Sequence, residues 1–266
     1  MQIMFSMIML SMMFVLIPRA SASAARINEV LAIAPIIKVE ETKEMTFHQK
    51  GYIEFQNVTF SYPGAEEPAL RNLSFSAEPG EITAIIGGTG SGKSTLLKLI
   101  SRFYDVDSGA VLVDGVNVKD MPIEVLRKKI GLVPQKAVLF TGSVKENILF
   151  GNEQATEEEI IHATKVAQAY DFVMNMKDGI NSEISQGGTN VSGGQKQRLS
   201  IARALVRKPE IYMFDDSFSA LDFKTDAKLR AALKEETTES TVLNVAQRVS
   251  TVMDANRIIV LDKGTV

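Results

Sequence analysis

The chain lacks cysteine and tryptophan, and it has only two histidines among its 266 residues. Without cysteine it forms no disulfide, has no thiol nucleophile and offers zinc no thiolate ligand. His48 and His162 lie far apart and without metal-ligand spacing, which argues against a histidine metal site, and neither has an assigned role. An aromatic platform for a ligand must therefore use tyrosine or phenylalanine.

Positive charge is neither in excess nor clustered. The 29 Lys and Arg are scattered among 32 Asp and Glu, and the net charge is −3. A dedicated nucleic-acid-binding domain usually shows a basic stripe, so we expect no nucleic-acid partner. The apolar share of 45% and the charged share of 23% are typical of a globular chain with a buried core, and the length fits one or two domains.

The first 18 residues differ from the rest. The almost uncharged run from Ile3 to Ile17 would form a helix about 22 Å long, short of the roughly 30 Å of a bilayer core. A helix buried in a soluble protein would alternate apolar and polar residues, and this run barely does. Two interpretations stay open. Small residues at 20–24 favour a signal peptide, although no positive charge precedes the run, whereas Arg19 and Arg26 favour the end of a transmembrane helix with a cytoplasmic flank.

Residues 19–50 indicate a connector, with a short helix expected at about 26–33, and the folded part is expected from about Gly51. In that part, alternating or β-branched segments predict strands, and helical spacing predicts helices between them. This order indicates a mostly parallel α/β sheet. The expected strands are residues 52–60, 73–77, 82–86, 111–113, 130–133, 211–214, 241–245 and 258–261, and the expected helices are 94–103, 122–129, 156–174, 192–206 and 227–236.

A glycine-rich loop follows the strand at 82–86 and precedes a helix. Its spacing, G-x-x-x-x-G-K-S, is that of a loop whose backbone N–H groups close around phosphates. We expect Lys93 to reach the β- and γ-phosphates and Ser94 to ligate Mg²⁺, with Asp215, at the end of an apolar strand, as the second magnesium residue. The residues predicted to hold the nucleotide here are Gly87, Gly88, Thr89, Gly90, Ser91, Gly92, Lys93, Ser94 and Thr95.

A second anion site is predicted at Ser192, Gly193, Gly194 and Gln195, just before a helix. By itself this sequence is equally typical of an ordinary helix N-terminus, in which a serine caps the helix and glycines follow it. With the phosphate loop and this signature in order, residues 51–266 resemble the nucleotide-binding domain of ATP-binding cassette (ABC) transporters. The resemblance implies a P-loop NTPase fold of the RecA-like type, with a mostly parallel α/β core, an antiparallel β subdomain and an inserted helical subdomain at about 135–204.

The resemblance also implies roles for single residues. Tyr62 would stack on adenine, Gln135 would touch Mg²⁺ and face the membrane domain, and the loop that ends at Asp222 would cross between two domains. Two such domains sandwich two ATP molecules, and the signature of each clamps the ATP on the phosphate loop of the other. Residues 139–148 look like the exporter branch, so residues 1–18 would be the end of the last transmembrane helix. We therefore expect a membrane location, with this domain on the cytoplasmic side.

Two residues depart from the hydrolytic members of the family. Asp216 stands where those members have Glu, which sets its carboxylate about 1.5 Å further back, and misplacement by about 1 Å can slow a reaction on the order of 10²-fold. Gln247 stands where they have His, and an amide carries no proton charge. Both changes together resemble the degenerate chain of a heterodimeric exporter. We expect a chain that binds Mg-ATP, hydrolyses it slowly and lends its signature to a different partner chain.

Other classes fit less well. A DNA-repair or chromosome ATPase would need a coiled coil between phosphate loop and signature, and Ser94 and Ser192 are only 98 residues apart without heptads. A translation-associated ATPase would need a second cassette. A regulatory nucleotide-binding module without transport coupling stays open as the alternative. We further expect a fragment, because the apolar run looks cut and residues 263–266 end at the start of another strand; its sequence does not identify a transported substrate.

Overall fold

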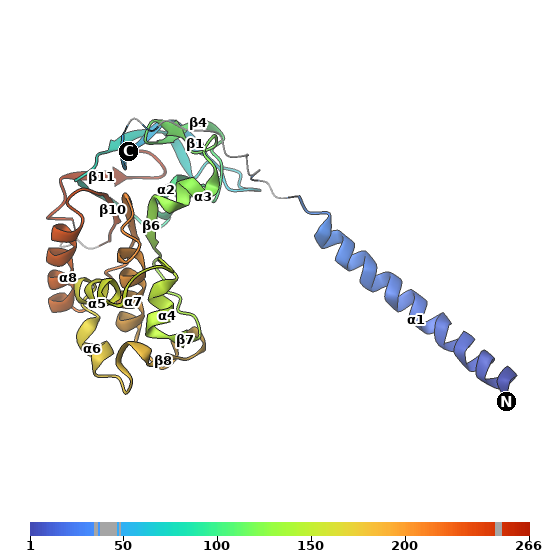
Figure 1. The fold of residues 1–266 in the computed structure, drawn as a ribbon. Helices are drawn as coiled ribbons and strands as arrows, with labels where there is room; N and C mark the ends of the chain where they lie inside the picture. The colour runs from blue at the N-terminus through green and yellow to red at the C-terminus, as the bar shows by residue number, and fades with distance from the viewer. Residues whose placement is uncertain (35–36, 38–46, 48, 248–251) are drawn as a thin grey trace. The chain divides into compact units, whose positions relative to one another are not determined.

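The computed structural model describes residues 1–34, 37, 47, 49–247 and 252–266. By its internal contacts the chain divides into two compact units, Met1–Lys38 and Val39–Val266. The first unit contains one long helix, and the second contains all the strands and the remaining helices of the described residues (Figure 1).

The helix of the first unit, α1 (Gln2–Leu31), is longer than the sequence predicted. It has 30 residues, none of them buried, and it is long and apolar enough to cross a membrane, a test that a signal sequence also passes. The separate short helix expected at about 26–33 is therefore wrong, because α1 continues to Leu31. Pro18 removes one backbone donor, but the alanine-rich segment after it has high helix propensity and continues the helix.

A five-stranded parallel sheet in the order β11-β3-β10-β9-β6 forms the centre of the second unit. Because every pairing is parallel, all five carboxyl ends lie along one edge, where α/β sheets bind ligands. Strand β10 is buried at all five positions, as expected for a strand covered on both faces. The strands are β3 (Ile82–Gly87), β6 (Ile130–Val133), β9 (Ile211–Asp215), β10 (Thr241–Val245) and β11 (Arg257–Leu261).

Helices cover both faces of this sheet. On one face, α2 (Lys93–Ile100) shares a hydrophobic cluster with Met213 and Leu243. On the other face, α8 (Phe223–Glu236) shares a second cluster with Phe214. Adjacent residues of β9 enter different cores because side chains alternate along a strand.

A four-stranded antiparallel sheet, in the order β2-β1-β4-β5, packs on the α2 side. Its inward side chains, such as Phe55 and Val111, belong to the same cluster as Leu96 of α2. The antiparallel sheet therefore holds α2, and with it the loop before α2, from the side opposite the parallel sheet. The strands are β1 (Ile53–Phe60), β2 (Leu70–Ala77), β4 (Ser108–Val113) and β5 (Val116–Asn117), and α3 (Ile123–Lys128) precedes β6.

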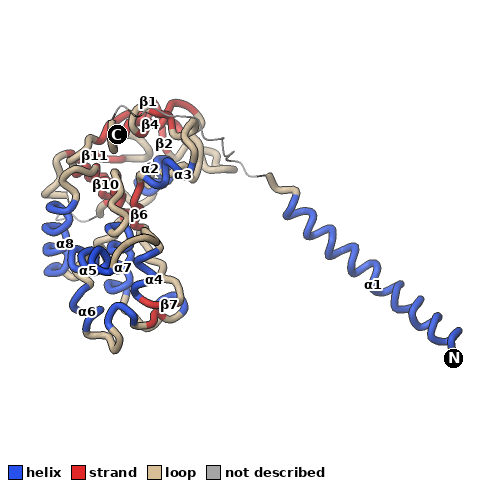
Figure 2. The backbone as a smooth tube through the Cα atoms, viewed as in Figure 1, coloured by secondary structure: helices blue, strands red, loops and turns tan. Residues whose placement is uncertain are grey.

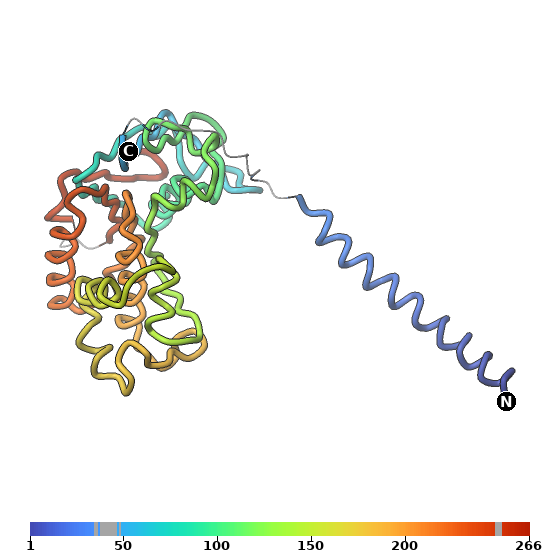
Figure 3. The backbone as a smooth tube through the Cα atoms, viewed as in Figure 1, coloured from blue at the N-terminus to red at the C-terminus, as the bar shows by residue number. Residues whose placement is uncertain are grey.

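The chain leaves the parallel sheet after β6, passes through a mostly helical part and returns at β9 (Figures 2 and 3). The single helix expected at 156–174 is wrong, because Gln168 takes a left-handed φ of 54° and separates two helices. The mostly parallel core, the antiparallel sheet and the helical insertion are confirmed. The insertion contains β7 (Gly142–Ser143), α4 (Val144–Leu149), α5 (Glu157–Val166), α6 (Tyr170–Met174), a 3₁₀ turn (Gly179–Asn181), β8 (Glu183–Ile184), a 3₁₀ turn (Gln186–Gly188) and α7 (Gly193–Leu205).

Candidate nucleotide-binding site

A cleft of about 480 Å³ opens at the carboxyl edge of the parallel sheet, within the usual size range of small-molecule pockets. The ends of β9 and β10, the segment after β6 and the amino end of α2 all contribute to it. Its lining contains the predicted nucleotide, magnesium and catalytic residues, apart from Gly87, Gly88, the signature and Asp222. The lining residues are Tyr62, Ala69, Thr89, Gly90, Ser91, Gly92, Lys93, Ser94, Thr95, Gln135, Asp215, Asp216, Val245 and Gln247.

The loop between β3 and α2 requires glycine at position 87, and it surrounds the ammonium group of Lys93. A Cβ atom on Gly87, which has a φ of 156°, would collide with the carbonyl oxygen of Leu261. The ammonium of Lys93 turns back over the loop, where Nζ donates to the carbonyl oxygens of Gly87 at 2.8 Å and Gly88 at 2.7 Å. Its charge is therefore held inside the loop at the amino end of α2, where an anion is favoured.

Ser94 and Asp215 lie in direct contact. Ser94 Oγ donates to Asp215 Oδ1 at 2.8 Å, although the two residues come from the first turn of α2 and the last position of β9. Burial raises the pKa of Asp215, and the neighbouring Asp216 raises it further, while the bond from Ser94 acts in the opposite direction. A hydroxyl and a carboxylate at this place are hard oxygen ligands of the kind that Mg²⁺ takes. A cation here would also offset the burial of the Asp215 charge, so the residues fit the predicted metal.

Two amides converge on Asp216. Its Oδ2 accepts from Gln247 Nε2 at 3.1 Å and from Gln135 Nε2 at 3.3 Å. The backbone of Asp216 is left-handed, with a φ of 47°, and its N–H donates to the carbonyl oxygen of Val245 at 2.9 Å. The structure therefore brings the three predicted catalytic residues into one cluster at the edge of the cleft, and fixes the direction of the Asp216 carboxylate from two sides.

Tyr62 also lines the cleft. Its hydroxyl lies 3.0 Å from Thr95 Oγ1, and its ring packs edge-on against Phe60 and Tyr104, with ring centroids 5.0 and 5.2 Å away. These contacts hold a half-buried aromatic ring beside the phosphate loop. Adenine stacking by this ring stays a prediction.

The signature does not line this cleft; it begins α7 in the helical part. Ser192 Oγ accepts from the Gln195 N–H at 3.3 Å, and Gln195 Oε1 accepts from the Ser192 N–H at 2.8 Å, a capping box. A Cβ on Gly194 would lie 3.2 Å from the carbonyl oxygen of Ala220, so the first turn of α7 packs closely on the loop after Asp216.

Asp222 also lies outside the cleft, at the end of that same loop. It caps α8, and its Oδ1 accepts from the Thr225 N–H at 3.0 Å, a bond that lowers the pKa of the carboxyl. The structure therefore places Asp222 near the signature, where Gly193 and Gly194 begin α7, and apart from the residues that line the phosphate cleft.

Two hydrogen bonds that sequence reasoning missed hold the backbone just before Gln135. Gln197 of α7 donates from Nε2 to the Pro134 carbonyl oxygen at 3.1 Å, and Ser217 donates from Oγ to the Val133 carbonyl oxygen at 2.9 Å. Both side chains are almost fully buried. The position of Gln135 is thus tied both to the signature helix and to the segment that carries Asp216. The sole sequence signal for these bonds was Gln197, a glutamine on the buried face of a helix.

Comparison with known proteins gives one family. Residues 70–219 match the family model described as "ABC transporter". The chain is 46% identical to an uncharacterized ABC transporter ATP-binding protein of Mycobacterium tuberculosis, over 100% of this chain and 46% of that protein. It is 47% identical to the uncharacterized ABC transporter ATP-binding protein YfiB of Bacillus subtilis, over 96% of this chain and 44% of that protein.

Exporters are among the similar proteins. The chain is 45% identical to a putative multidrug export ATP-binding/permease protein of Staphylococcus aureus, over 81% of this chain and 37% of that protein. A solved structure of a bacterial Atm1-family ABC exporter with ATP bound matches with a TM-score of 0.90 and 32% identity, over 97% of this chain and 45% of that chain. The chain spans about half the length of the curated relatives it matches.

Proposed function

The chain belongs to the ABC transporter family, and we propose that it is the ATP-binding part of an exporter, in which ATP binding and hydrolysis power export across a membrane. Domains of this kind are ATPases. The observation that carries the proposal is the cleft itself, where the Lys93 ammonium inside the loop and the Ser94–Asp215 pair meet at the sheet edge. The exporter relatives and the membrane-length α1 support a membrane location with the nucleotide domain on the cytoplasmic side.

ATP would be held by the loop at 87–95, with Lys93 at its β- and γ-phosphates and Tyr62 beside its base. Mg²⁺ would be held by Ser94, Asp215 and Gln135. When bound, the ion neutralises charge on the phosphates. This chain's own residues then orient the γ-phosphate and the attacking water, which is a task of position more than of covalent chemistry.

We propose that this site hydrolyses ATP slowly. A base that orients water must reach it, and the Asp216 carboxylate is one methylene shorter than that of Glu and is held by two amides. Gln247 donates a hydrogen bond to Asp216 and has no proton charge to offer a γ-phosphate. The same two residues also fit the alternative, a regulatory module that binds ATP without hydrolysis or transport coupling.

The partner we propose is a second ABC chain, different from this one, together with a transmembrane domain belonging to either chain. The support is the position of the signature: Ser192 to Gln195 are intact, begin α7 and do not line their own cleft, so they are available to an ATP held by another chain. Asp222 and its loop adjoin them and would form part of the same contact.

The test compares the full chain alone with the chain mixed with candidate partner cassettes that carry the Glu and the His. We expect tight ATP binding with little phosphate release alone, and release on mixing that Ser192→Ala abolishes. Lys93→Ala is the control, because it removes nucleotide binding at this site. Brisk release by the chain alone would refute the asymmetric mechanism in favour of a symmetric homodimer, and failure to co-purify with any polytopic partner would favour the regulatory module.

A further inference from the structure

An asparagine is the fourth of the five residues of β10, a strand that otherwise consists of one threonine and three apolar residues. Asn244 belongs to β10, which is buried at all five positions, and parallel strands covered on both faces usually consist of apolar residues. Its side chain is 5% exposed, and its Oδ1 has no hydrogen-bond partner among the described residues. A buried amide oxygen without a partner is destabilising, so it needs a physical reason.

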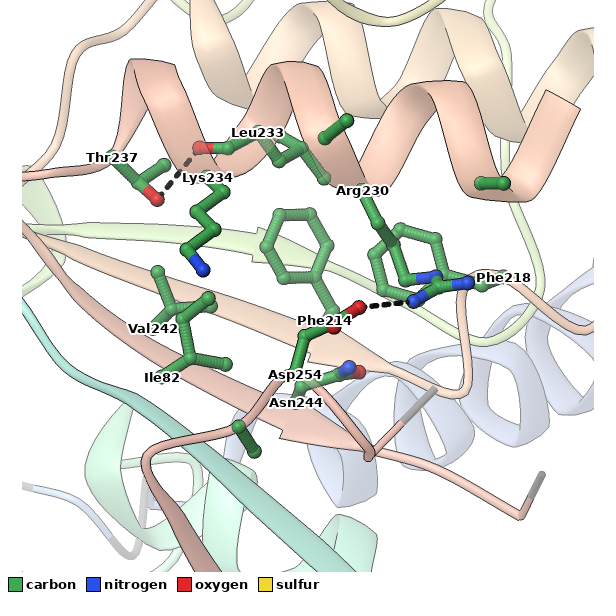
Figure 4. A pocket seen from close by; sticks show the side chains of 13 residues that line it. Ile82, Phe214, Phe218, Arg230, Leu233, Lys234, Thr237, Val242, Asn244 and Asp254 are labelled. Atoms are coloured by element: carbon green, nitrogen blue, oxygen red, sulfur yellow. Dashed lines mark hydrogen bonds and ion pairs between the residues drawn. The ribbon is translucent and has the colours of Figure 1, made fainter. Parts of the chain in front are cut away.

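Asn244 lines a cavity of about 300 Å³ between α8 and the sheet (Figure 4). Phe214 and Phe218 supply aromatic surface, and Ile82 and Val242 supply aliphatic surface. The volume is at the lower end of the range for ligand pockets, and a small number of polar groups on an apolar lining is typical of such sites. The cavity lies on the α8 face of the sheet, and none of its lining residues lines the nucleotide cleft.

Two cations line this cavity, and one of them has no ion pair among the described residues. Arg230 is paired twice: its Nη1 lies 2.6 Å from Asp254 Oδ2, and its Nε lies 3.4 Å from Asp226 Oδ2. Lys234, an exposed residue one turn further along α8, has no ion pair among the described residues. Figure 4 shows its ammonium directed from the helix towards the sheet side of the cavity. A lone cation beside apolar surface favours a ligand with one negative group.

We propose that this cavity binds a small amphipathic anion. Its aromatic or aliphatic body would pack on Phe214 and Phe218, a single carboxylate would lie beside Lys234, and a hydrogen-bond donor would satisfy Asn244 Oδ1. A nucleoside triphosphate does not fit this description, because it carries several charges and the cavity offers one free cation among its described residues. The proposal does not depend on the exporter assignment.

The cavity adjoins the residues that position the nucleotide chemistry. Phe214 directly precedes Asp215, and Asn244 directly precedes Val245, whose carbonyl oxygen accepts from the Asp216 N–H. A molecule in the cavity would therefore contact the same two strands that hold both aspartates.

The test uses 5-fluoroindole-3-acetate, which combines an aromatic body, one carboxylate and one N–H donor. Its dissociation constant for the full chain is measured by fluorine relaxation, with Mg-ATP present so that the nucleotide cleft is occupied. Two matched probes remove one feature each: 5-fluoro-3-methylindole lacks the carboxylate, and 1-methyl-5-fluoroindole-3-acetate lacks the donor. Lys228→Gln, on α8 but outside the cavity lining, is the control for loss of charge alone.

We expect Lys234→Gln to weaken binding of the acid about threefold to fivefold and to leave the methylindole unchanged. Asn244→Val, an apolar residue suited to a buried strand, is expected to weaken the N–H acid about fivefold and to leave the N-methyl acid unchanged. Equal binding by all variants, or no binding above that of an Ala231→Phe variant, which enlarges a residue of the cavity lining, would overturn the proposal. Loss of ATP binding alone would count against the proposed function and not against this site.

Discussion

Lengthening Asp216 is expected to restore hydrolysis at this site. Asp216→Glu moves the carboxylate forward by one C–C bond, about 1.5 Å. In the present chain the carboxylate accepts amide bonds of 3.1 Å from Gln247 and 3.3 Å from Gln135, so an extension of that size necessarily rearranges both. The substitution therefore changes the reach of the base and the two contacts that direct it.

The expected gain follows from the sensitivity of such reactions to position. Because an error of about 1 Å can cost on the order of 10²-fold, recovery of the lost reach is expected to raise turnover by about tenfold to a hundredfold. ATP affinity should change little, since the phosphates are held by the loop and Lys93, which Asp216 does not contact in the described residues. Gln247→His, added to Asp216→Glu, is expected to raise turnover further.

The assay is a single-turnover measurement, with the chain in excess over labelled ATP and mixed with a partner cassette whose own hydrolytic base has been removed. Only the site built on this chain's phosphate loop can then release phosphate. Lys93→Ala gives the background, and a fluorescent ATP analogue measures binding separately. If Asp216→Glu bound ATP as tightly as the parent and released phosphate no faster, the length of the acid would not be the cause of slow turnover. If the parent already turned over at the rate of the variant, the site would not be degenerate at all.

Three further predictions concern single contacts. Gln197→Met removes the donor to the Pro134 carbonyl oxygen, so we expect unfolding in denaturant to show a loss of about 0.5–1.5 kcal/mol, and Gln197→Glu to do no better. Burial raises the pKa of Asp215, so its ionised form opposes folding above that pKa. Asp215→Asn should therefore raise Tm at neutral pH by about 1–3 °C without Mg²⁺, and this gain should shrink as pH falls. The same substitution should abolish stabilisation by Mg²⁺. Lys129→Met should destabilise by about 3–5 kcal/mol in the same denaturant assay, because Nζ lies 2.8 Å from the fully buried Asp114 carboxylate; an unchanged midpoint would show that the pair contributes nothing.

The phosphate loop could be predicted because its function is local in sequence. One glycine-rich segment between a strand and a helix supplies the Gly87 turn, the Lys93 charge and the predicted Ser94 ligand, and the structure places Ser94 against Asp215. The end of α1 could not be predicted from the apolar run, because the alanines after Pro18 extend the helix by propensity and not by hydrophobicity.

Contacts between distant segments were the other part that could not be predicted. The bonds from Gln197 to Pro134 and from Ser217 to Val133 join residues 63 and 84 positions apart, and neither donor belongs to a recognisable pattern. The break at Gln168 was missed for a different reason: glutamine has no intrinsic preference for the left-handed region. Here the N–H groups of Gln168 and Ala169 donate to the carbonyl oxygens of Lys165 and Thr164, and end α5 with a left-handed residue. Short strands such as β7 and β8 have two residues each and carry no periodicity.

The order of the strands places Gln135 and Gln247 beside Asp216. Strand β9 lies between β6 and β10, so the residue after β9 is flanked by the residues after its neighbours, and Gln135 and Gln247 meet Asp216 from opposite sides. A shorter acid and an amide neighbour are mutually compatible, because the Gln247 N–H satisfies the Asp216 oxygen without a charge. Their effects on turnover should therefore be non-additive, with Gln247→His alone gaining less than it gains beside Asp216→Glu. Additive gains in the single-turnover assay would show that the two residues act independently, despite the 3.1 Å contact between them.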